Sequence, residues 1–343
     1  PASNRQTAGQ PQMQNAILIG IGAGLASAAL YSTVVSYSLL AFILLYLAPL
    51  PLFIAGFGWG AVTAGIGAIA GSLAIMIATG FKPGLLFFLS VGLSPILISH
   101  LAQLSRPVPP GTTGPAIASD REYYPEGRMV LWLAAMAGLL VTVTVLILGP
   151  DAESFRAAMR DMLSRSMTVN PALQNDLPQA NTEELKALIE IFVRLMPPVS
   201  GVLWLLAAFV NVLLAAKIVT ASNRALRPWA PFHALSFPRS AVYGPLAAMV
   251  LAILPGTVGI VGETYVAVLL AAFALVGLAS IHRRTLGLDS RPLILGAVYG
   301  VLLIFNWIVV LALSGIGITQ TMARRDTDNG GSAPNGGLPP VSS

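Results

Sequence analysis

Apolar stretches, each about as long as a lipid bilayer is thick, recur along nearly the whole chain. Residues 16–35 contain no charged side chain. At 1.5 Å of helical rise per residue, such a run covers ~30 Å, the thickness of the hydrocarbon core. The further runs are 39–54, 58–80, 85–104, 129–148, 199–219, 241–254, 265–281 and 292–316. Because a soluble domain cannot bury so much apolar surface, the sequence predicts an all-α polytopic transmembrane helix bundle of eight or nine spans.

The composition supports a membrane protein. Hydrophobic residues make up 55% of the chain, charged residues only 10%, and the mean hydropathy is +0.78. A soluble domain would be about a quarter charged. The net charge of +5 comes from basic residues in loops that flank the apolar runs, which is the positive-inside pattern and excludes a nucleic-acid-binding face. The chain has no cysteine, so disulfides and thiolate chemistry are excluded.

The second apolar run is interrupted by Pro49-Leu50-Pro51. Proline removes a backbone donor and kinks a helix. In a bilayer, such a break persists only where protein or a water-filled cavity satisfies the freed carbonyl groups. The second run is therefore predicted as a broken span or a short re-entrant helix, and Pro49 and Pro51 are candidate site residues. A re-entrant second helix would leave eight full spans.

The basic residues also predict the orientation of the chain in the bilayer. The loop between residues 220 and 240 carries Arg224, Arg227 and Arg239 and no acidic residue, which places it in the cytoplasm. The N-terminus is then cytoplasmic, and we expect the inner membrane of a bacterium. The arginine pair in the C-terminal tail argues against an outside C-terminus, which keeps an even number of spans open.

One long polar segment divides the membrane-embedded sequence. We expect an N-terminal bundle of about five spans in residues 16–148, an extracytoplasmic loop in residues 149–197, and a C-terminal bundle of about four spans in residues 198–318. Residues 1–15 and 319–343 are polar and contain little apolar sequence, which predicts disordered tails.

The loop at residues 149–197 is predicted to form two amphipathic helices. The apolar residues of the first share one face: Phe155, Met159, Met162, Leu163 and Met167. The second helix begins at Asn181 or Thr182, where two glutamates follow in the first turn. Its apolar face consists of Leu185, Leu188, Ile189, Phe192 and Leu195. We expect both helices to lie on the outer membrane surface, or to form a lid over a substrate path, and Pro197–Pro198 to stop or kink the second.

Small residues recur every four positions on two of the predicted helices. They are Gly20, Gly24, Ala28 and Ser32 on the first, and Gly56, Gly60, Ala64, Ala68 and Ser72 on the third, with Gly67 and Gly71 also four apart. Such faces let helix backbones approach closely in lipid, where no hydrophobic force drives helices together. They predict close packing, either within this bundle or against a separate membrane partner.

Three segments of the sequence occur in the order found in one protein family. They are YLAPLPLFIAGFGWG at residues 46–60, EYYPEGR at residues 122–128 and GLASIH at residues 277–282. Together they resemble the YybS-like family of uncharacterised bacterial membrane proteins, which implies a polytopic membrane protein but no catalytic residue. That family is distantly similar to the substrate-binding subunits of energy-coupling-factor vitamin transporters, whose first helix docks through small residues on a transmembrane partner. Gly20, Gly24 and Ala28 match that feature, although this chain has more spans than those six-helix subunits.

Polar side chains at membrane depth are the candidate binding residues, because they are costly to place in lipid. Asn211 lies in the middle of the sixth run, and Asn306 lies beside Trp307 in the last. Glu263, near a membrane edge, is predicted either to bind a cationic group or to cap the following helix.

We hypothesise that the helices bearing Asn211 and Asn306 meet the proline break of the second run in one polar pocket near the membrane midplane. Interrupted helices form substrate sites of this kind in transporters. The alternative is that each Asn side chain only forms a hydrogen bond between helices.

No motif of a hydrolase or of a nucleotide-binding protein is present, and the acidic residues do not cluster as metal ligands would. We therefore expect no enzyme activity, no cofactor and no metal. The sequence predicts small-molecule transport or substrate binding, driven by an ion gradient or by an ATPase module in a partner, and leaves the substrate open. The competing prediction is a non-transporting membrane scaffold or assembly factor that recruits partner proteins.

Overall fold

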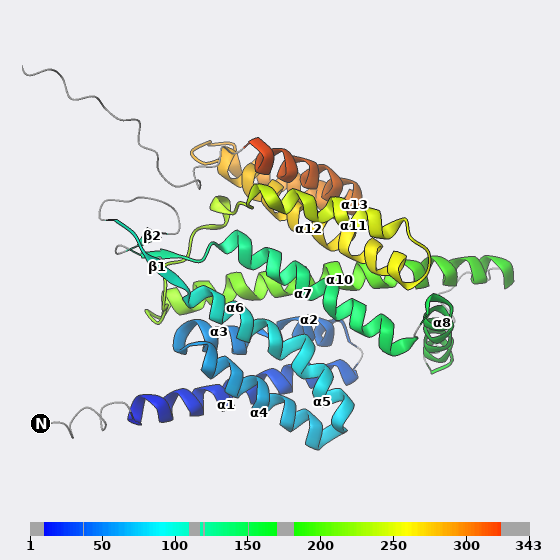
Figure 1. Ribbon diagram of the computed structural model, residues 1–343, viewed down its shortest axis with the longest axis horizontal. Coiled ribbons are helices and arrows are strands. Elements are labelled where there is room, and N and C mark those ends of the chain that lie inside the picture. Colours follow the sequence, from blue (N-terminus) through cyan, green and yellow to red (C-terminus); the bar gives the residue numbers. More distant parts are fainter. Residues whose placement is uncertain are drawn as a thin grey trace, which may run out of the picture.

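The computed structural model describes residues 10–36, 38–109, 117–118, 121–149, 151–169 and 182–323. Most of these residues are helical, and the long helices lie side by side, whereas α8 runs across their direction (Figure 1). In the described part of the chain, seven helical segments are long and apolar enough to cross a membrane. The predicted all-α polytopic bundle is therefore confirmed.

The chain order of the elements is as follows. The first part contains α1 (Gln10–Ser32), η1 (Thr33–Ser36), α2 (Leu39–Leu47), α3 (Leu50–Trp59), α4 (Ala61–Thr79), α5 (Phe81–Phe87), η2 (Phe88–Gly92) and α6 (Leu93–Gln103). A small antiparallel sheet with strand order β1-β3-β2 follows, formed by β1 (Ser105–Pro107), β2 (Ile117–Ala118) and β3 (Arg121–Tyr123). The remainder contains α7 (Glu126–Leu148), α8 (Ala152–Val169), α10 (Thr182–Ala221), η3 (Phe232–Ala234), η4 (Arg239–Val242), α11 (Tyr243–Ala252), α12 (Thr257–Arg284) and α13 (Arg291–Ala323).

The small-residue faces of α1 and α4 pack against each other within the chain. A Cβ atom added at Gly20 would lie 2.7 Å from the carbonyl oxygen of Thr63, and one added at Gly24 would overlap the carbonyl oxygen of Gly67. A Cβ atom at Gly71 would lie 2.7 Å from the carbonyl oxygen of Gly24. The backbones of the two helices therefore touch, which only glycine permits at these positions.

Two other small residues have different surroundings. Ala28 is 5% exposed and belongs to the apolar cluster between α1, α3 and α4. Gly60 lies in the tight turn between α3 and α4 with φ of 106°, a conformation that glycine adopts without strain. Gly60 thus turns the chain and is not part of the α4 packing face.

Two spans of the first part have interrupted helices. The second span consists of α2 and α3, which the prolines separate, and together they form a candidate span of 21 residues. The fourth span contains η2, a π-helical turn between α5 and α6. Each interruption disturbs the regular i→i−4 hydrogen-bond pattern of its helix at membrane depth.

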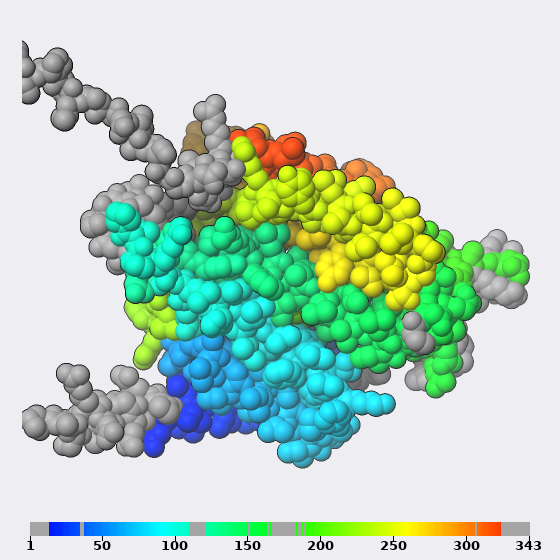
Figure 2. Space-filling view, in the orientation of Figure 1, coloured from blue at the N-terminus to red at the C-terminus, as the bar shows by residue number. Residues whose placement is uncertain are grey.

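The segment predicted as an outer loop has a different arrangement from the one expected. α10 begins at Thr182 and continues without a stop through Pro197–Pro198 into the sixth span, for 40 residues in all. At 1.5 Å per residue this is ~60 Å, about twice the hydrocarbon thickness. Its first turns therefore project beyond the bundle, and α8 lies across them, as Figures 1 and 2 show. Asn181 and residues 170–180 lie outside the described part of the chain.

α8 contacts α7 through apolar side chains and the projecting part of α10 through an ion pair. Phe155 packs with Val141 and Val145 of α7 and is 3% exposed. Arg160 of α8 forms an ion pair with Glu190 of α10 at 2.5 Å. The second predicted helix is thus the continuation of the sixth span and not a separate helix.

A further segment packs along α12 and begins without a regular helix. Residues 232–252 run antiparallel along α12: the Phe232 ring contacts His282 near one end of α12, and Ala252 packs on Gly262 toward the other. Only the last ten residues of this segment, α11, form an α-helix. Protein contacts can stabilise such irregular backbone at membrane depth, where lipid cannot.

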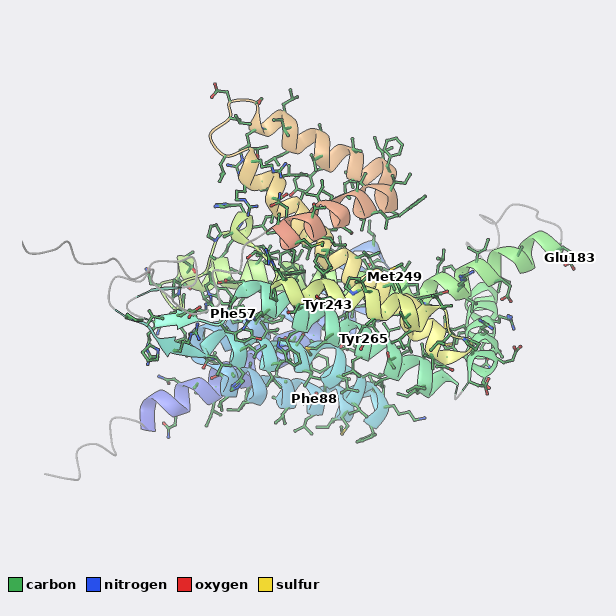
Figure 3. The ribbon with its side chains drawn as sticks, turned by 45° about the horizontal axis from the view of Figure 1, so that its top comes forward. Phe57, Phe88, Glu183, Tyr243, Met249 and Tyr265 are labelled. Carbon is green, nitrogen blue, oxygen red and sulfur yellow. The ribbon has the colours of Figure 1, made fainter. Side chains whose placement is uncertain are left out.

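The last apolar segment folds back on itself. Tyr299 of α13 hydrogen-bonds His282 at 2.9 Å, and Gln320 accepts a hydrogen bond from the neighbouring Arg283 at 3.0 Å. Between them, Ser314 contacts the middle of α12. A straight helix cannot make this series of contacts, so the chain reverses direction between Tyr299 and Ser314, as Figure 3 shows. The two apolar parts are Arg291–Phe305 and Trp307–Ala323.

The start of α1 and the end of α13 therefore lie at the same end of the bundle, together with the β-sheet (Figure 1). We name this the inner end, after its predicted cytoplasmic location, and the end that carries α8 the outer end. The sequence predicted disordered tails at residues 1–15 and 319–343. Helix already extends from Gln10 and to Ala323, and residues 1–9 and 324–343 lie outside the described part of the chain.

Because the chain has no cysteine, a single introduced thiol can test the orientation. Ser222, exposed after α10, should label as Ser222→Cys with an impermeant thiol reagent only in inside-out vesicles. The control is Ala157→Cys on the exposed face of α8, which should label in intact cells. The reverse pattern at the two positions would invert the predicted topology.

Candidate mid-membrane binding site

Asn211 lies in the middle of α10 and is 0% exposed. Its side-chain Nδ2 donates to the carbonyl of Tyr46 at 2.7 Å and to the carbonyl of Ala207 at 2.8 Å. In an unbroken helix, the Tyr46 carbonyl would accept from the N–H of Leu50. Since α2 ends at Leu47, Asn211 satisfies a carbonyl group at the proline break. The structure thus brings together Asn211 and the interruption of the second span.

The oxygen of the Asn211 side chain, Oδ1, is buried and has no hydrogen-bond partner in the described part of the chain. A buried polar atom without a partner costs about 1–3 kcal/mol. The residues of the surrounding core cluster are apolar and include Phe53, Phe209 and Val212. The site therefore presents a single acceptor in an apolar environment, which a hydrogen-bond donor from a bound molecule would satisfy.

Trp204 lies about two turns from Asn211 toward the outer end of α10. Its Nε1 donates to the carbonyl of Ser90 in the π-helical turn η2 at 2.9 Å. Each interrupted span of the first part is thus bound to a polar group of α10. Trp204 was not among the candidates predicted from the sequence. The available signal was an indole N–H far from the membrane interface, the region in which Trp is usually found.

Glu263 lies at the outer end of the bundle. It accepts a hydrogen bond from Nη2 of Arg194 at 2.9 Å, and with Arg156 the pair lines a hollow of about 240 Å³. α12 begins at Thr257, so Glu263 does not cap this helix; it binds a cationic side chain instead. Among the described residues, no group of three or more His, Cys, Asp and Glu side chains could hold a metal ion.

Asn306 and Trp307 lie in α13, where the chain folds back. The side chain of Asn306 lies outside the described residues, and Trp307 is 69% exposed. α13 packs on α12 and η4, whereas the proline break packs on α10. The structure therefore does not bring the helix of Asn306 to the Asn211 site.

Aromatic side chains fill the space between the proline break and the inner end. Phe53 and Phe57 follow Pro49 on one face of α3, and both are buried. Their ring centroids are 5.6 Å apart, and the Phe57 ring lies 4.5 Å from that of Trp229 in the loop after α10. Figure 3 marks Phe57 in the part of the bundle near the sheet. An aromatic column of Phe53, Phe57 and Trp229 thus runs from the helix after the proline break to the loop after α10.

Arg227 holds the inner end of this column in place. Its side chain is 3% exposed, pairs with the carboxylate of Glu126, and donates to the carbonyl of Tyr124 at 2.8 Å. The guanidinium carbon lies 4.9 Å from the centroid of the Trp229 ring and 5.2 Å from that of Tyr123. Burial lowers the pKa of Arg227, and the Glu126 carboxylate opposes this shift, so the guanidinium remains charged.

From the sequence, Arg227 was predicted only as one of the basic residues that place its loop in the cytoplasm. Its partner Glu126 is 101 positions away, so no local pattern links them. The loop has several arginines and no acidic residue. This is a weak signal for a long-range ion pair, because a buried arginine in such a loop must pair with a carboxylate from another part of the chain.

The comparisons with known proteins agree with this architecture. Searches of the curated proteins and of the solved structures find no match. Residues 25–321 match the model of a family described as predicted membrane protein (DUF2232). With its seven candidate spans, this chain is a multi-pass membrane protein and belongs to that family.

Proposed function

We propose that the protein binds a small polar molecule in the membrane interior and moves it across the bilayer, alone or as the substrate-binding part of a membrane complex. One observation carries this proposal: two interrupted spans meet polar side chains of α10, and one of these, Asn211, has an unsatisfied buried oxygen. Transporters place their substrate sites at such helix interruptions near the midplane.

The chemistry around Asn211 indicates a class of ligand. Oδ1 is an acceptor, so the ligand must supply a donor such as a hydroxyl, an amide or an amine. The core cluster that contains its neighbour Val212 is apolar. An uncharged molecule with hydrogen-bond donors therefore fits better than an ion, because an unpaired charge in such surroundings is costly.

Transport in this protein would draw on an ion gradient or on an ATPase module in a partner, since the chain has no nucleotide-binding motif. The sequence resemblance to substrate-binding subunits of energy-coupling-factor transporters is consistent with the second route. α4 already covers the small-residue face of α1. A membrane partner would therefore dock on the lipid-facing side of α1, where Leu18 and Leu25 are exposed.

The scaffold alternative has less support. It depended on the small-residue faces and on the basic loop after α10 as surfaces for partner proteins. Gly20 and Gly24 pack on α4 within the chain, and Arg227 is buried, which leaves only Arg224 and Arg239 exposed among the arginines of the loop.

Asn211→Leu tests the proposed site. Protein purified from its own membrane in lipid nanodiscs should retain a small molecule that native mass spectrometry detects, and the variant should lose it. The unfolding free energy should fall by only ~0.6–2 kcal/mol, because hydrogen bonds between membrane helices contribute little. Thr144→Val, which removes a hydroxyl from the exposed face of α7, is the control and should retain the molecule. Retention by the Asn211 variant would move the site elsewhere.

A further inference from the structure

We propose that α3 is the inner gate of the Asn211 site and that the Arg227–Glu126 ion pair holds this gate shut. The inference depends on the proposed function only for what passes through the gate. The gate itself is defined by the backbone of α3, by the aromatic column beneath Asn211, and by the loop after α10.

α3 is a short rigid helix between two backbone breaks. At one end, Pro49 and Pro51 interrupt the hydrogen bonding of the second span, and Pro49 provides no side-chain cap. At the other end, Gly60 has φ of 106°. Changes of a few dihedral angles at such element ends are enough to swing a helix as a rigid body. The ten residues between them form the moving part.

The position of α3 decides whether Asn211 can be reached from the inner end. Pro49, Phe53 and Phe57 lie on one face of α3, beginning at the break that Asn211 binds. Phe53 and Phe57 are buried in the same core cluster as Val212, the neighbour of Asn211. A displacement of α3 would move both rings together and open a path to the unsatisfied Oδ1 of Asn211.

The loop after α10 fastens α3 in the closed position. The N–H of Leu226 donates to the carbonyl of Phe57 at 3.3 Å, and the Trp229 ring covers the Phe57 ring. Arg227 lies between these two residues and joins the loop to Glu126, at the start of α7. The Glu126 carboxylate also accepts from the N–H of Ala230 at 3.3 Å. Release of the ion pair would therefore free this loop from α3, whose other faces pack on α1, α4, α6 and α10.

The ion pair at the outer end, between Arg194 and Glu263, is weaker than the pair between Arg227 and Glu126. The side chains of Arg194 and Glu263 are 75% and 35% exposed, whereas those of Arg227 and Glu126 are 3% and 23% exposed. Exposed pairs contribute little, while a buried charge that loses its partner is strongly destabilised. The inner pair is thus the contact whose breaking has a large energetic consequence, as the latch of a gate requires.

Thiol accessibility tests the gate without any ligand. Ala215→Cys places the only thiol of the chain one helical turn from Asn211 toward the inner end, at a position that is 0% exposed. An impermeant methanethiosulfonate should label it slowly in inside-out vesicles. Adding Glu126→Gln or Trp229→Ala should speed labelling at least about tenfold, because the open population rises. Unchanged rates in both variants would refute the gate.

The matched control for this experiment is Glu122→Gln. Glu122 of β3 forms an ion pair with Arg106 of β1; its side chain is 26% exposed, close to the 23% of Glu126, but its partner is 77% exposed. Its replacement should leave the labelling rate of the Ala215→Cys thiol unchanged. Faster labelling in this control as well would mean general loosening of the inner end, and would contradict a specific latch.

A disulfide across the gate gives a second test that does not depend on weakened variants. A Cβ atom at Gly58 would lie 3.8 Å from the Cβ atom of Arg224, the usual separation in a disulfide. In Gly58→Cys/Arg224→Cys, oxidation should slow hydrogen–deuterium exchange of the α3 amides about tenfold relative to the reduced form, with α12 unchanged. Equal exchange in both forms would show that α3 does not open. Because no substrate is involved, either result leaves the proposed function to its own test.

Discussion

Replacement of Arg227 by alanine should lower the unfolding free energy by about 3–5 kcal/mol, a large effect for a single substitution. The change leaves the Glu126 carboxylate partly buried without its cation and removes the cation–π contacts to Trp229 and Tyr123. Titration with a denaturing detergent in mixed micelles, followed by circular dichroism, measures this loss.

The double variant Arg227→Met/Glu126→Leu should recover most of that stability, because it removes both charges and keeps apolar volume at the site. Arg106→Ala, which breaks the ion pair between β1 and β3, should have little effect because the Arg106 side chain is 77% exposed. If the double variant were as unstable as Arg227→Ala, packing of the arginine and not its charge would be the source of the stability.

Replacement of Gly24 by leucine should separate α1 from α4 and destabilise the protein by about 1–3 kcal/mol or more. The new Cβ atom would overlap the backbone of Gly67, which cannot move without shifting α4. Gly22→Leu is the matched control on the same helix, because a Cβ atom there meets nothing within 4 Å. Equal melting temperatures of the two variants in detergent would contradict the close approach of α1 and α4.

Much of the mid-membrane site could be predicted from the sequence. Asn211 is a lone amide in an apolar run, and the two prolines mark a helix break, so each stands out by local chemistry. That the two meet follows only from the packing of α10 against the second span. Asn306 stands out in the same way, yet α13 packs on α12 and η4 instead. Local polarity identifies candidates, but it does not say which helices are neighbours.

The sequence by itself determined that this is a polytopic membrane protein, and where most of its spans lie. The physical reason is that the bilayer imposes length and apolar character on each span separately, so every span can be read from its own residues. The proline break and the start of α10 near Thr182 also follow from local rules.

Only the tertiary structure decided the features that depend on distant residues. These are the irregular start of the segment at residues 232–252, the reversal of α13, the continuation of α10 through its proline pair, and the burial of Arg227 against Glu126. In each case, the residues packed against the segment supply partners for its freed backbone groups or for its buried charge, which residues nearby in the sequence do not supply. The interactions responsible join residues far apart in the chain, so no periodicity or motif in the sequence contains them.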